Sequence, residues 1–589
     1  MKKRLSTVGA AVIAGAAVVA AAMLICLGGG HGAAAEVPQV VPLTTATTVP
    51  GPYLDLQWRL DPSSLSDNPE SNQVMMAPAV ADVNGDGSPE VVFTTFKGGP
   101  FYNYVSDGII RVVRGGTGVL IYSIDDPAYR VVPIGQIAVA DIDNDNSPEI
   151  VAIRDDQGGT VCNSLIAFDG PTGLPEWIGD CVPVGAPDDY HLGGGPTIAH
   201  DPSVGTVIVV GQSVYDNQGN ALWSVLGSTG GDLSCVADLD QDWTPEVIAG
   251  NTAAGSVSWH NALAPDGFCA VADFFGSGSP QVVDVGDGQV WLLDGLTGAT
   301  VLVFGGPGWP QDIVPGITPG SGSGGGPPCV ADFDGDTHPE IGVAGAAHPD
   351  PQHPQDTVVH LSVFRGNGSL MWTYLVQDSS SVSTSCAAFD FDLNGAYEIA
   401  YRDEDRFYIF DGSTGTVLFR TAVSGTWFEC PSGTMHEMPV VANIDNDAYA
   451  EVVVPCNNYG KVAHNGSGGT GIEVYEGNQF LVTGRIWNEH TYHITNVDWP
   501  GTVPIPEVAS WLDGNKYRAQ PSDPCSDALC ATVGGTVELH SDGSASSARA
   551  ADGGGAAPFP FPAIAGGIAA AALLALTAGA WYARRRWNR

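Results

Sequence analysis

A nine-residue acidic motif recurs along the chain and limits what the chain can fold into. In one copy, acids stand at the first, third, fifth and ninth positions, as Asp141, Asp143, Asp145 and Glu149. Alternate carboxylates on a tight turn form the oxygen-rich shell that Ca²⁺ prefers. An EF-hand loop begins in the same way, but its last acid falls at position 12 and it lies between helices. Short apolar, β-branched runs flank this copy and predict strands, so the motif is a candidate Ca²⁺ loop between two strands.

Six copies of the motif keep a complete set of oxygen donors at the odd positions. The seventh residue of each copy can offer its backbone carbonyl, so its side chain is free to vary. The predicted metal ligands are Asp82, Asn84, Asp86, Ser88 and Glu90; Asp141, Asp143, Asp145, Ser147 and Glu149; Asp238, Asp240, Asp242, Thr244 and Glu246; Asp332, Asp334, Asp336, His338 and Glu340; Asp390, Asp392, Asn394, Ala396 and Glu398; and Asn443, Asp445, Asp447, Tyr449 and Glu451. Ordinary turns are rich in Asp and Gly but do not need acids at fixed offsets. We therefore predict about four to six Ca²⁺ ions.

Two further copies keep the flanking strand signals but lose the acids. The copy at Asp273 retains one carboxylate, and the segment 198–202 before the apolar run 207–210 is more degraded. We expect both to be structural repeats without metal.

The repeats follow one another at a period that is typical of β-propeller blades. Asp82 and Asp141 lie 59 residues apart, whereas Asp238 and Asp273 lie only 35 apart. Most units add a second strand, a turn of the type Gly-x-Thr-Gly and a strand that often carries Trp, such as Trp372. Alternating strands and turns with this period predict an all-β propeller of seven or eight blades, with one small sheet per blade.

The repeated pattern resembles the FG-GAP/VCBS repeats of integrin α-like propellers, which also occur in bacterial cell-surface proteins. The resemblance covers about residues 53–487. It implies Ca²⁺ in the acidic loops on one rim, and ligand recognition by loops on a propeller face. One departure is the Glu at the ninth position, as in Glu149, where integrin loops usually end in Asp.

The charge of the chain excludes some partners. The formal net charge is -43, with 65 acidic residues against 22 Lys and Arg, and seven of those basic residues lie at the two ends of the chain. Such a surface repels nucleic acid and attracts cations, so we expect no nucleic-acid partner.

The ends of the chain predict export and a membrane or cell-surface location. Residues 1–35 have the three parts of a signal peptide, and 36–52 form a linker before the propeller at 53–487. We assign 488–540 to a C-terminal extension of the propeller and 541–562 to a flexible Gly/Ser/Pro stalk. Residues 563–583 form a transmembrane helix, with 584–589 as a basic cytoplasmic tail. The same tail resembles bacterial C-terminal sorting tags; if it is one, the helix is removed and the protein is released or re-anchored.

Ten cysteines remain after the leader, and an even number in an exported chain predicts disulfides. The candidates are Cys162, Cys181, Cys235, Cys269, Cys329, Cys386, Cys430, Cys456, Cys525 and Cys530. Sequential pairing is the simplest arrangement, although spacing does not fix the connectivity. Their scatter along the chain argues against a zinc cluster.

We find no catalytic motif in the sequence. There is no Gly-x-Ser-x-Gly elbow, phosphate loop or dinucleotide fingerprint between a strand and a helix. His490 and His493 have no Glu between them, as a zinc protease would require, so we predict a packing role for this segment.

The function that these features predict is ligand binding or adhesion by an exported, Ca²⁺-binding propeller that is not an enzyme. Its partner would be an extracellular protein or glycan. Two alternatives stay open: a polysaccharide lyase or other carbohydrate-active enzyme on a Ca²⁺-stabilised propeller, and a structural component of a surface coat.

Overall fold

The structure is a computed structural model of the chain. It describes residues 54–98, 105–156, 163–182, 194–224, 233–305, 325–347, 358–378, 383–424, 427–447, 449–458, 468–477 and 483–521. The predicted leader, linker, stalk, C-terminal helix and basic tail lie outside these residues. Within the described ranges, no helix is both long and apolar enough to cross a membrane.

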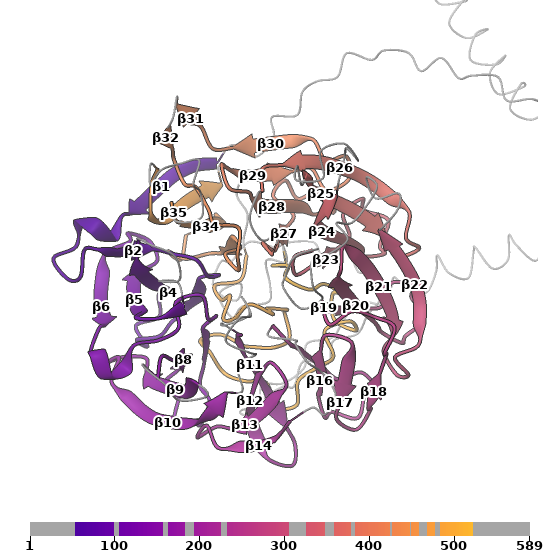
Figure 1. Cartoon of the computed structure of the whole chain (residues 1–589), viewed down its shortest axis with the longest axis horizontal. Helices are drawn as coiled ribbons and strands as arrows, with labels where there is room; N and C mark the ends of the chain where they lie inside the picture. Colours follow the sequence, from indigo (N-terminus) through magenta and orange to yellow (C-terminus); the bar gives the residue numbers. More distant parts are fainter. Residues whose placement is uncertain are drawn as a thin grey trace, which may run out of the picture. The chain divides into compact units, whose positions relative to one another are not determined.

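Eight antiparallel sheets stand around a ring, so the chain is an eight-bladed β-propeller (Figure 1). Blades 1 to 4 contain β2 (Ser71–Gln73), β3 (Ala79–Ala81), β4 (Glu90–Lys97), β5 (Ile109–Arg114) and β6 (Leu120–Ile124); β7 (Ala138–Ala140), β8 (Glu149–Arg154), β9 (Asn163–Asp169) and β10 (Pro175–Val182); β11 (Pro196–Asp201), β12 (Gly205–Val210), β13 (Ser213–Asp216) and β14 (Ala221–Ser224); and β15 (Cys235–Ala237), β16 (Glu246–Ala249), β17 (Thr252–Ala254) and β18 (Trp259–His260). The prediction of a propeller is confirmed, and the short interval after Asp238 is a complete blade of short strands.

The second half of the ring repeats this plan. Blades 5 to 8 contain β19 (Phe268–Ala272), β20 (Gln281–Gly286), β21 (Gln289–Asp294) and β22 (Thr300–Gly305); β23 (Cys329–Ala331), β24 (Glu340–Ala347), β25 (Val358–Arg365) and β26 (Leu370–Val376); β27 (Ala387–Phe389), β28 (Glu398–Arg402), β29 (Phe407–Phe410) and β30 (Val417–Arg420); and β33 (Val440–Ala442), β34 (Glu451–Cys456), β35 (Gly471–Gly477) and β1 (Leu54–Leu60). Outside the blades lie the hairpin of β31 (Val423–Ser424) and β32 (Trp427–Phe428) and the 3₁₀ turns η2 (Pro62–Ser64) and η4 (Pro127–Tyr129).

Burial falls from the inner to the outer strand of a blade, and the residue types follow it. The inner strand of blade 2 is Ala-Val-Ala, and all three residues are buried. Its side chains are small because the inner strands of neighbouring blades converge near the axis and leave little room. Its second strand is an apolar run, and its outermost strand, β10, alternates between half-buried and exposed residues. This is the pattern of a sheet that faces solvent along one edge.

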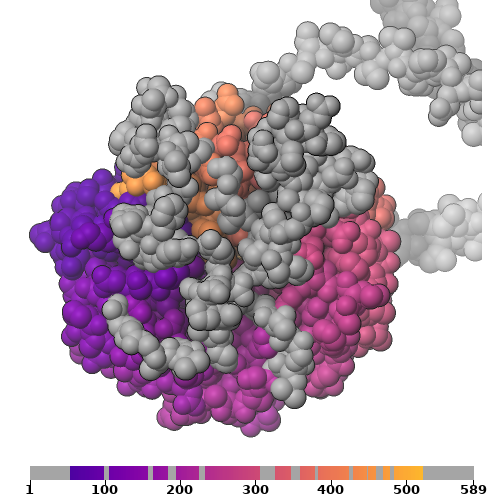
Figure 2. Space-filling view, viewed as in Figure 1, coloured from indigo at the N-terminus to yellow at the C-terminus, as the bar shows by residue number. Residues whose placement is uncertain are grey.

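The first strand of the chain closes the ring. β1 pairs with β35 in antiparallel register from Leu54–Gly477 to Leu60–Ile472, so the start of the chain supplies the outermost strand of blade 8. Figure 2 shows the result, with the indigo start of the chain beside the orange part near its described end.

Aromatic side chains join several outer strands to the next blade. The indole Nε1 of Trp372 in blade 6 donates to the carbonyl of Gly412 in blade 7 at 2.6 Å, and that of Trp259 in blade 4 donates to Gly295 in blade 5 at 2.8 Å. The last Gly of the Gly-x-Thr-Gly turn, Gly415, has a φ of 70°, and a Cβ there would lie 2.5 Å from the Trp372 ring. Glycine at the end of this turn therefore allows the Trp ring of the neighbouring blade to pack against the backbone.

Residues 483–521, which we call the central segment, fill the middle of the ring (Figure 1). Their hydrogen bonds reach the inner edge of all eight blades: Trp487 with Val80, Asn488 with Val139, Glu489 with Ile198, Trp511 with Asp238, Asn515 with Asp273, Tyr517 with Val330, Gln520 with Ala388, and Gly484 with Asn443. The edge of each inner strand that faces the axis carries backbone N–H and C=O groups without a partner strand. The central segment forms hydrogen bonds with part of these groups.

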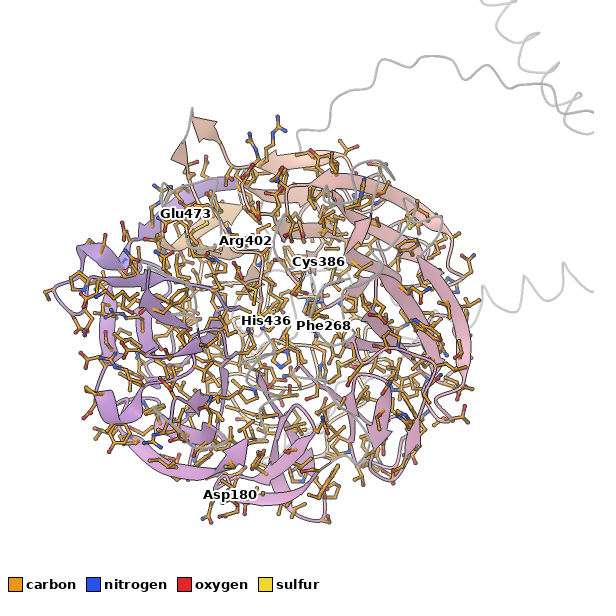
Figure 3. The ribbon with its side chains drawn as sticks, in the orientation of Figure 1. Asp180, Phe268, Cys386, Arg402, His436 and Glu473 are labelled. Atoms are coloured by element: carbon orange, nitrogen blue, oxygen red, sulfur yellow. A yellow bond between two sulfur atoms is a disulfide. The ribbon has the colours of Figure 1, made fainter. Side chains whose placement is uncertain are left out.

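Three disulfides are formed among the described residues. Cys235–Cys269 joins β15 to β19, and Cys329–Cys386 joins β23 to the residue before β27 (Cys386 is labelled in Figure 3). Cys430–Cys456 joins the segment after β32 to the last residue of β34. All three follow the sequential order of the cysteines. Cys181 is also disulfide-bonded, while Cys162, Cys525 and Cys530 lie outside the described residues.

Candidate metal centres

Each acidic loop joins the first and second strands of a blade, so all six lie at the same end of the ring. Neighbouring loops touch. The Asn446 side chain donates to the carbonyl of Gly87 at 3.0 Å, which links the loops of blades 8 and 1. Gln241 donates to the carbonyl of Gly278 at 3.3 Å, which links the loops of blades 4 and 5.

The backbone of each loop explains the spacing of its acids. The fourth and sixth residues of the blade 2 loop, Asn144 and Asn146, have φ values of 65° and 71°. Left-handed residues at these two positions turn the odd-numbered side chains toward one centre, and Asn and Gly tolerate this conformation best. Asp141 fixes the turn, because its two carboxylate oxygens accept the N–H groups of Asp145 and Asn146, each at 3.0 Å.

The ninth-position Glu of each copy has one oxygen tied to the loop. That oxygen accepts the backbone N–H of the second loop residue at 2.6 to 3.1 Å in all six copies. The second oxygen of Glu90 accepts a hydrogen bond from Asn84, and that of Glu246 accepts hydrogen bonds from Ser256 and Val257, at 2.6 to 3.1 Å. In Glu149 and Glu451 this second oxygen is buried and accepts no hydrogen bond from the described residues.

In four of the loops, carboxylate oxygens gather into one cluster. Carboxylate oxygens of the first, third and ninth residues lie within 4.8 Å of one another in three loops, at Asp141, Asp143 and Glu149, at Asp238, Asp240 and Glu246, and at Asp390, Asp392 and Glu398. In the blade 6 loop the grouped acids are Asp332, Asp334 and Asp336. A hard cation that takes six to eight oxygens suits such a cluster.

The electrostatics of the loops favour a cation. Burial and nearby acids including Asp143 together raise the pKa of Glu149 to about 8, against the hydrogen bond from Ile142. Burial likewise raises the pKa of Glu90 and Glu340 to about 8 and that of Glu398 and Glu451 to about 9. A bound cation would neutralise these acids and hold them ionised.

The fifth side chain also stabilises the turn in all six loops. The fifth side chain accepts the backbone N–H of the seventh residue, at 2.6 to 2.9 Å, in the loops that contain Ser88, Ser147, Thr244, His338, Ala396 and Tyr449. In the first loop, the amide of Asn84 donates to Glu90 at 2.7 Å. In the last, the amide of Asn443 donates to the Asp447 carbonyl at 2.9 Å.

The blade 5 loop shows that the turn can form without the full set of acids. Asp273 accepts the N–H groups of Ser277 and Gly278 at 3.0 and 2.6 Å, and Gln281 accepts that of Phe274 at 2.9 Å. The loop therefore has the same fold with a single acid. The hydrogen bonds alone do not need a metal, and what distinguishes the other six loops is their additional acids, which cluster in at least four of them.

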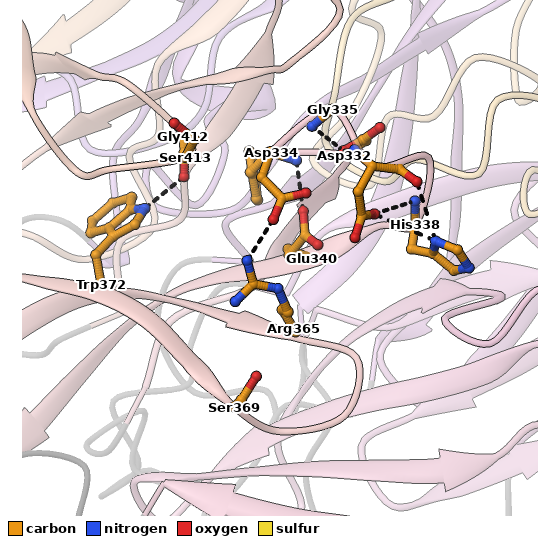
Figure 4. Close-up of polar contacts among 12 residues, drawn as sticks. Asp332, Asp334, Gly335, His338, Glu340, Arg365, Ser369, Trp372, Gly412 and Ser413 are labelled. Carbon is orange, nitrogen blue, oxygen red and sulfur yellow. Dashed lines mark hydrogen bonds and ion pairs between the residues drawn. The ribbon is translucent and has the colours of Figure 1, made fainter. Parts of the chain in front are cut away.

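In two of the six loops, an acid already pairs with an arginine. Arg365, at the end of β25, donates to Asp334 at 2.6 Å in blade 6 (Figure 4), and Arg114 lies 3.9 Å from Asp86 in blade 1. Both arginines lie directly opposite the ninth-position Glu of their loop, in the pairing of the second and third strands of the blade. The same ladder position holds Asp169 in blade 2 and Glu476 in blade 8. The motif did not reveal this difference, because the arginines stand two dozen residues after it.

His490 and His493 belong to the buried core of the central segment. His493 Nε2 lies 2.7 Å from Glu507, and its ring stacks on Tyr517. Burial, with Arg518 nearby, lowers the pKa of His490 to about 3. Both rings pack inside the ring of blades, which agrees with the predicted packing role.

Fold and loops together define the class: an eight-bladed β-propeller with acidic loops at one end. No protein-family profile matches the sequence, and no curated protein does either, so membership of the FG-GAP/VCBS family stays a prediction.

Among solved structures, the chain is similar to the V. cholerae biofilm matrix protein Bap1, with a TM-score of 0.60 and 18% identity over 79% of this chain and 98% of that one. It also matches the rhamnogalacturonan lyase YesX, with a TM-score of 0.46 and 17% identity, and the Bacillus licheniformis rhamnogalacturonan lyase PL11, with a TM-score of 0.43 and 15% identity. Each lyase match covers 68% of this chain and 71% of the other. At these identities the likeness shows the fold alone.

Proposed function

We propose that this chain is an exported, surface-displayed propeller that binds Ca²⁺ in its acidic loops and acts in ligand binding or adhesion. The observation that carries the metal part is Glu149. Its Oε1 is buried without a hydrogen-bond partner among the described residues, beside Asp141 and Asp143. A buried carboxylate oxygen without a partner is costly, and Ca²⁺ supplies the missing positive charge.

Adhesion is supported by the likeness to a biofilm matrix protein over nearly the whole of that protein. Calcium would act on the scaffold: the ions cancel the repulsion among loop carboxylates and hold neighbouring loops, which already touch, in one arrangement. The partner we propose is an extracellular protein or glycan, recognised by loops on a propeller face. Attachment through the C-terminal segment 563–583 belongs to the same proposal.

The test is to probe glycan and protein arrays with the full chain, with Ca²⁺ and with a chelator. We expect selective binding that weakens when Ca²⁺ is removed. Equal signals in both conditions, or none, would contradict the proposal. Parallel incubation with acidic polysaccharides, followed by a search for unsaturated products, checks the enzymatic alternative, since turnover would replace adhesion by lyase activity. Ca²⁺-dependent self-assembly without array binding would favour a coat component.

A further inference from the structure

Two acids meet at the joint between blades 4 and 5, far from the acidic loops. Asp284 lies in β20, and Asp266 comes just before β19. The loop at Asp273 joins the opposite ends of the same two strands. Asp266 and that loop are thus separated by the length of β19, on the order of 20 Å at the rise of an extended chain. The pair is therefore independent of the acidic motif.

Asp284 is fully buried, and no hydrogen bond from the described residues reaches either of its oxygens. Burial raises the pKa of Asp284 well above its ordinary value, and Asp266 raises it further against the attraction of the Gly267 N–H. A carboxylate in such surroundings must either take up a proton or meet a cation.

Two glycines let neighbouring atoms approach this pair closely. A Cβ on Gly267 would lie 2.4 Å from Asp284 Oδ1 and 2.3 Å from the carbonyl oxygen of Val285. A Cβ on Gly250, in the turn between β16 and β17 of blade 4, would lie 1.9 Å from Asp266 Oδ1. The oxygens of Asp284 and Val285 thus lie close together beside Gly267, and the turn of blade 4 packs directly against Asp266.

We propose that Asp284, Asp266 and the carbonyl of Val285 hold a hard divalent cation of the Ca²⁺ class at this joint. All three donors are oxygens, which hard cations prefer. Cys269 lies directly opposite Asp284 in the β19–β20 ladder, but it forms a disulfide with Cys235 of blade 4. It therefore offers no thiolate ligand for a softer metal. The cation and the disulfide would fasten the same two blades at the same joint.

The test is to count Ca²⁺ ions bound per full chain and to measure thermal melting for the wild type, Asp284→Asn and a matched control, Asp294→Asn. Asp294 lies in the same blade and accepts turn hydrogen bonds from Thr297 that Asn can also accept. We expect Asp284→Asn to bind one ion fewer than the wild type, and the control to bind the full number. In chelator, Asp284→Asn should melt at or above the wild type, because it removes a buried acid.

A protonated Asp284 with no metal role gives a different result. The two variants and the wild type would then bind the same number of ions and gain equally from Ca²⁺, which would overturn the proposal. A wild type that binds one ion, lost in Asp284→Asn, would instead overturn Ca²⁺ binding by the acidic loops and leave this site standing.

A second measurement leaves both acids unchanged. Trp291 lies directly opposite Asp284 in the β20–β21 ladder. Terbium bound at the joint should be sensitised by this indole, so Trp291→Phe should remove part of the Tb³⁺ emission that Ca²⁺ competes away. Unchanged emission in Trp291→Phe would contradict a cation beside Asp284.

Discussion

The substitution Glu149→Gln should change sign in its effect on stability when Ca²⁺ is removed. Gln can still accept the N–H of Ile142, because Gln281 accepts that of Phe274 in the equivalent place of blade 5. The substitution therefore keeps the structural hydrogen bond and removes the charge. It changes only the part of Glu149 that we assign to the metal.

The magnitude follows from the pKa of Glu149, which is raised to about 8 in the metal-free fold. A raised carboxyl pKa means that the folded state holds its proton more tightly, so stability is fully present below the unfolded pKa and falls as pH rises toward 8. At pH 7 the loss is about 3 kcal/mol, which Glu149→Gln should recover in chelator. With Ca²⁺ at 1,000 times its dissociation constant, the wild-type loop instead gains about 4.1 kcal/mol that the variant lacks. This gain exceeds the free energy that the variant recovers, so the variant should then be the less stable protein by about 1 kcal/mol.

The assay is equilibrium urea unfolding of both proteins at pH 7, with Ca²⁺ and with chelator. Gln281→Glu is the matched control. It introduces a buried acid into a loop without the other carboxylates, so it should destabilise the protein in both conditions. If Glu149→Gln destabilises equally with and without Ca²⁺, Glu149 acts only through its hydrogen bond and the metal reasoning is refuted.

Three other perturbations test separate parts of the structure. Arg365→Gln removes the ion pair with Asp334, so calorimetric titration should find several-fold tighter Ca²⁺ binding at the blade 6 loop; unchanged affinities would mean that Arg365 does not compete with the cation. Replacing Cys235 and Cys269 by Ser opens a closure of 34 residues and should cost about 4 kcal/mol in urea unfolding. A cost near zero would mean that packing alone holds blades 4 and 5 together. Trp487→Ala removes a fully buried ring from the central segment and should cost about 3 to 5 kcal/mol by the same measurement, whereas a cost below about 1 kcal/mol would count against that segment as core.

The local features of this fold could be predicted from the sequence. The acids, the left-handed Asn and Gly residues and the flanking strands of a loop lie within a dozen residues of one another, so one motif contains the whole turn. The repeat of that motif then predicts the propeller and nearly fixes its number of blades.

The long-range features could not be predicted in this way. β1 pairs with β35, more than 400 residues later, and its sequence reads like any other strand. Arg365 reaches Asp334 only because antiparallel pairing places it opposite Glu340. Asp284 stands inside an apolar run, where burial and the lack of a partner become visible only when blade 4 packs against it.

The central segment also decides how the molecule would respond to mechanical load. The chain leaves the described fold after residue 521, from the middle of the ring, where the preceding residues bond to all eight blades. Tension applied through the C-terminal side would therefore act first at the axis and spread over eight inner strands at once. No single blade could be peeled away from its edge. A propeller pulled in this way should yield at a higher force than one held by its outermost strand, since β1 is bonded to one blade alone.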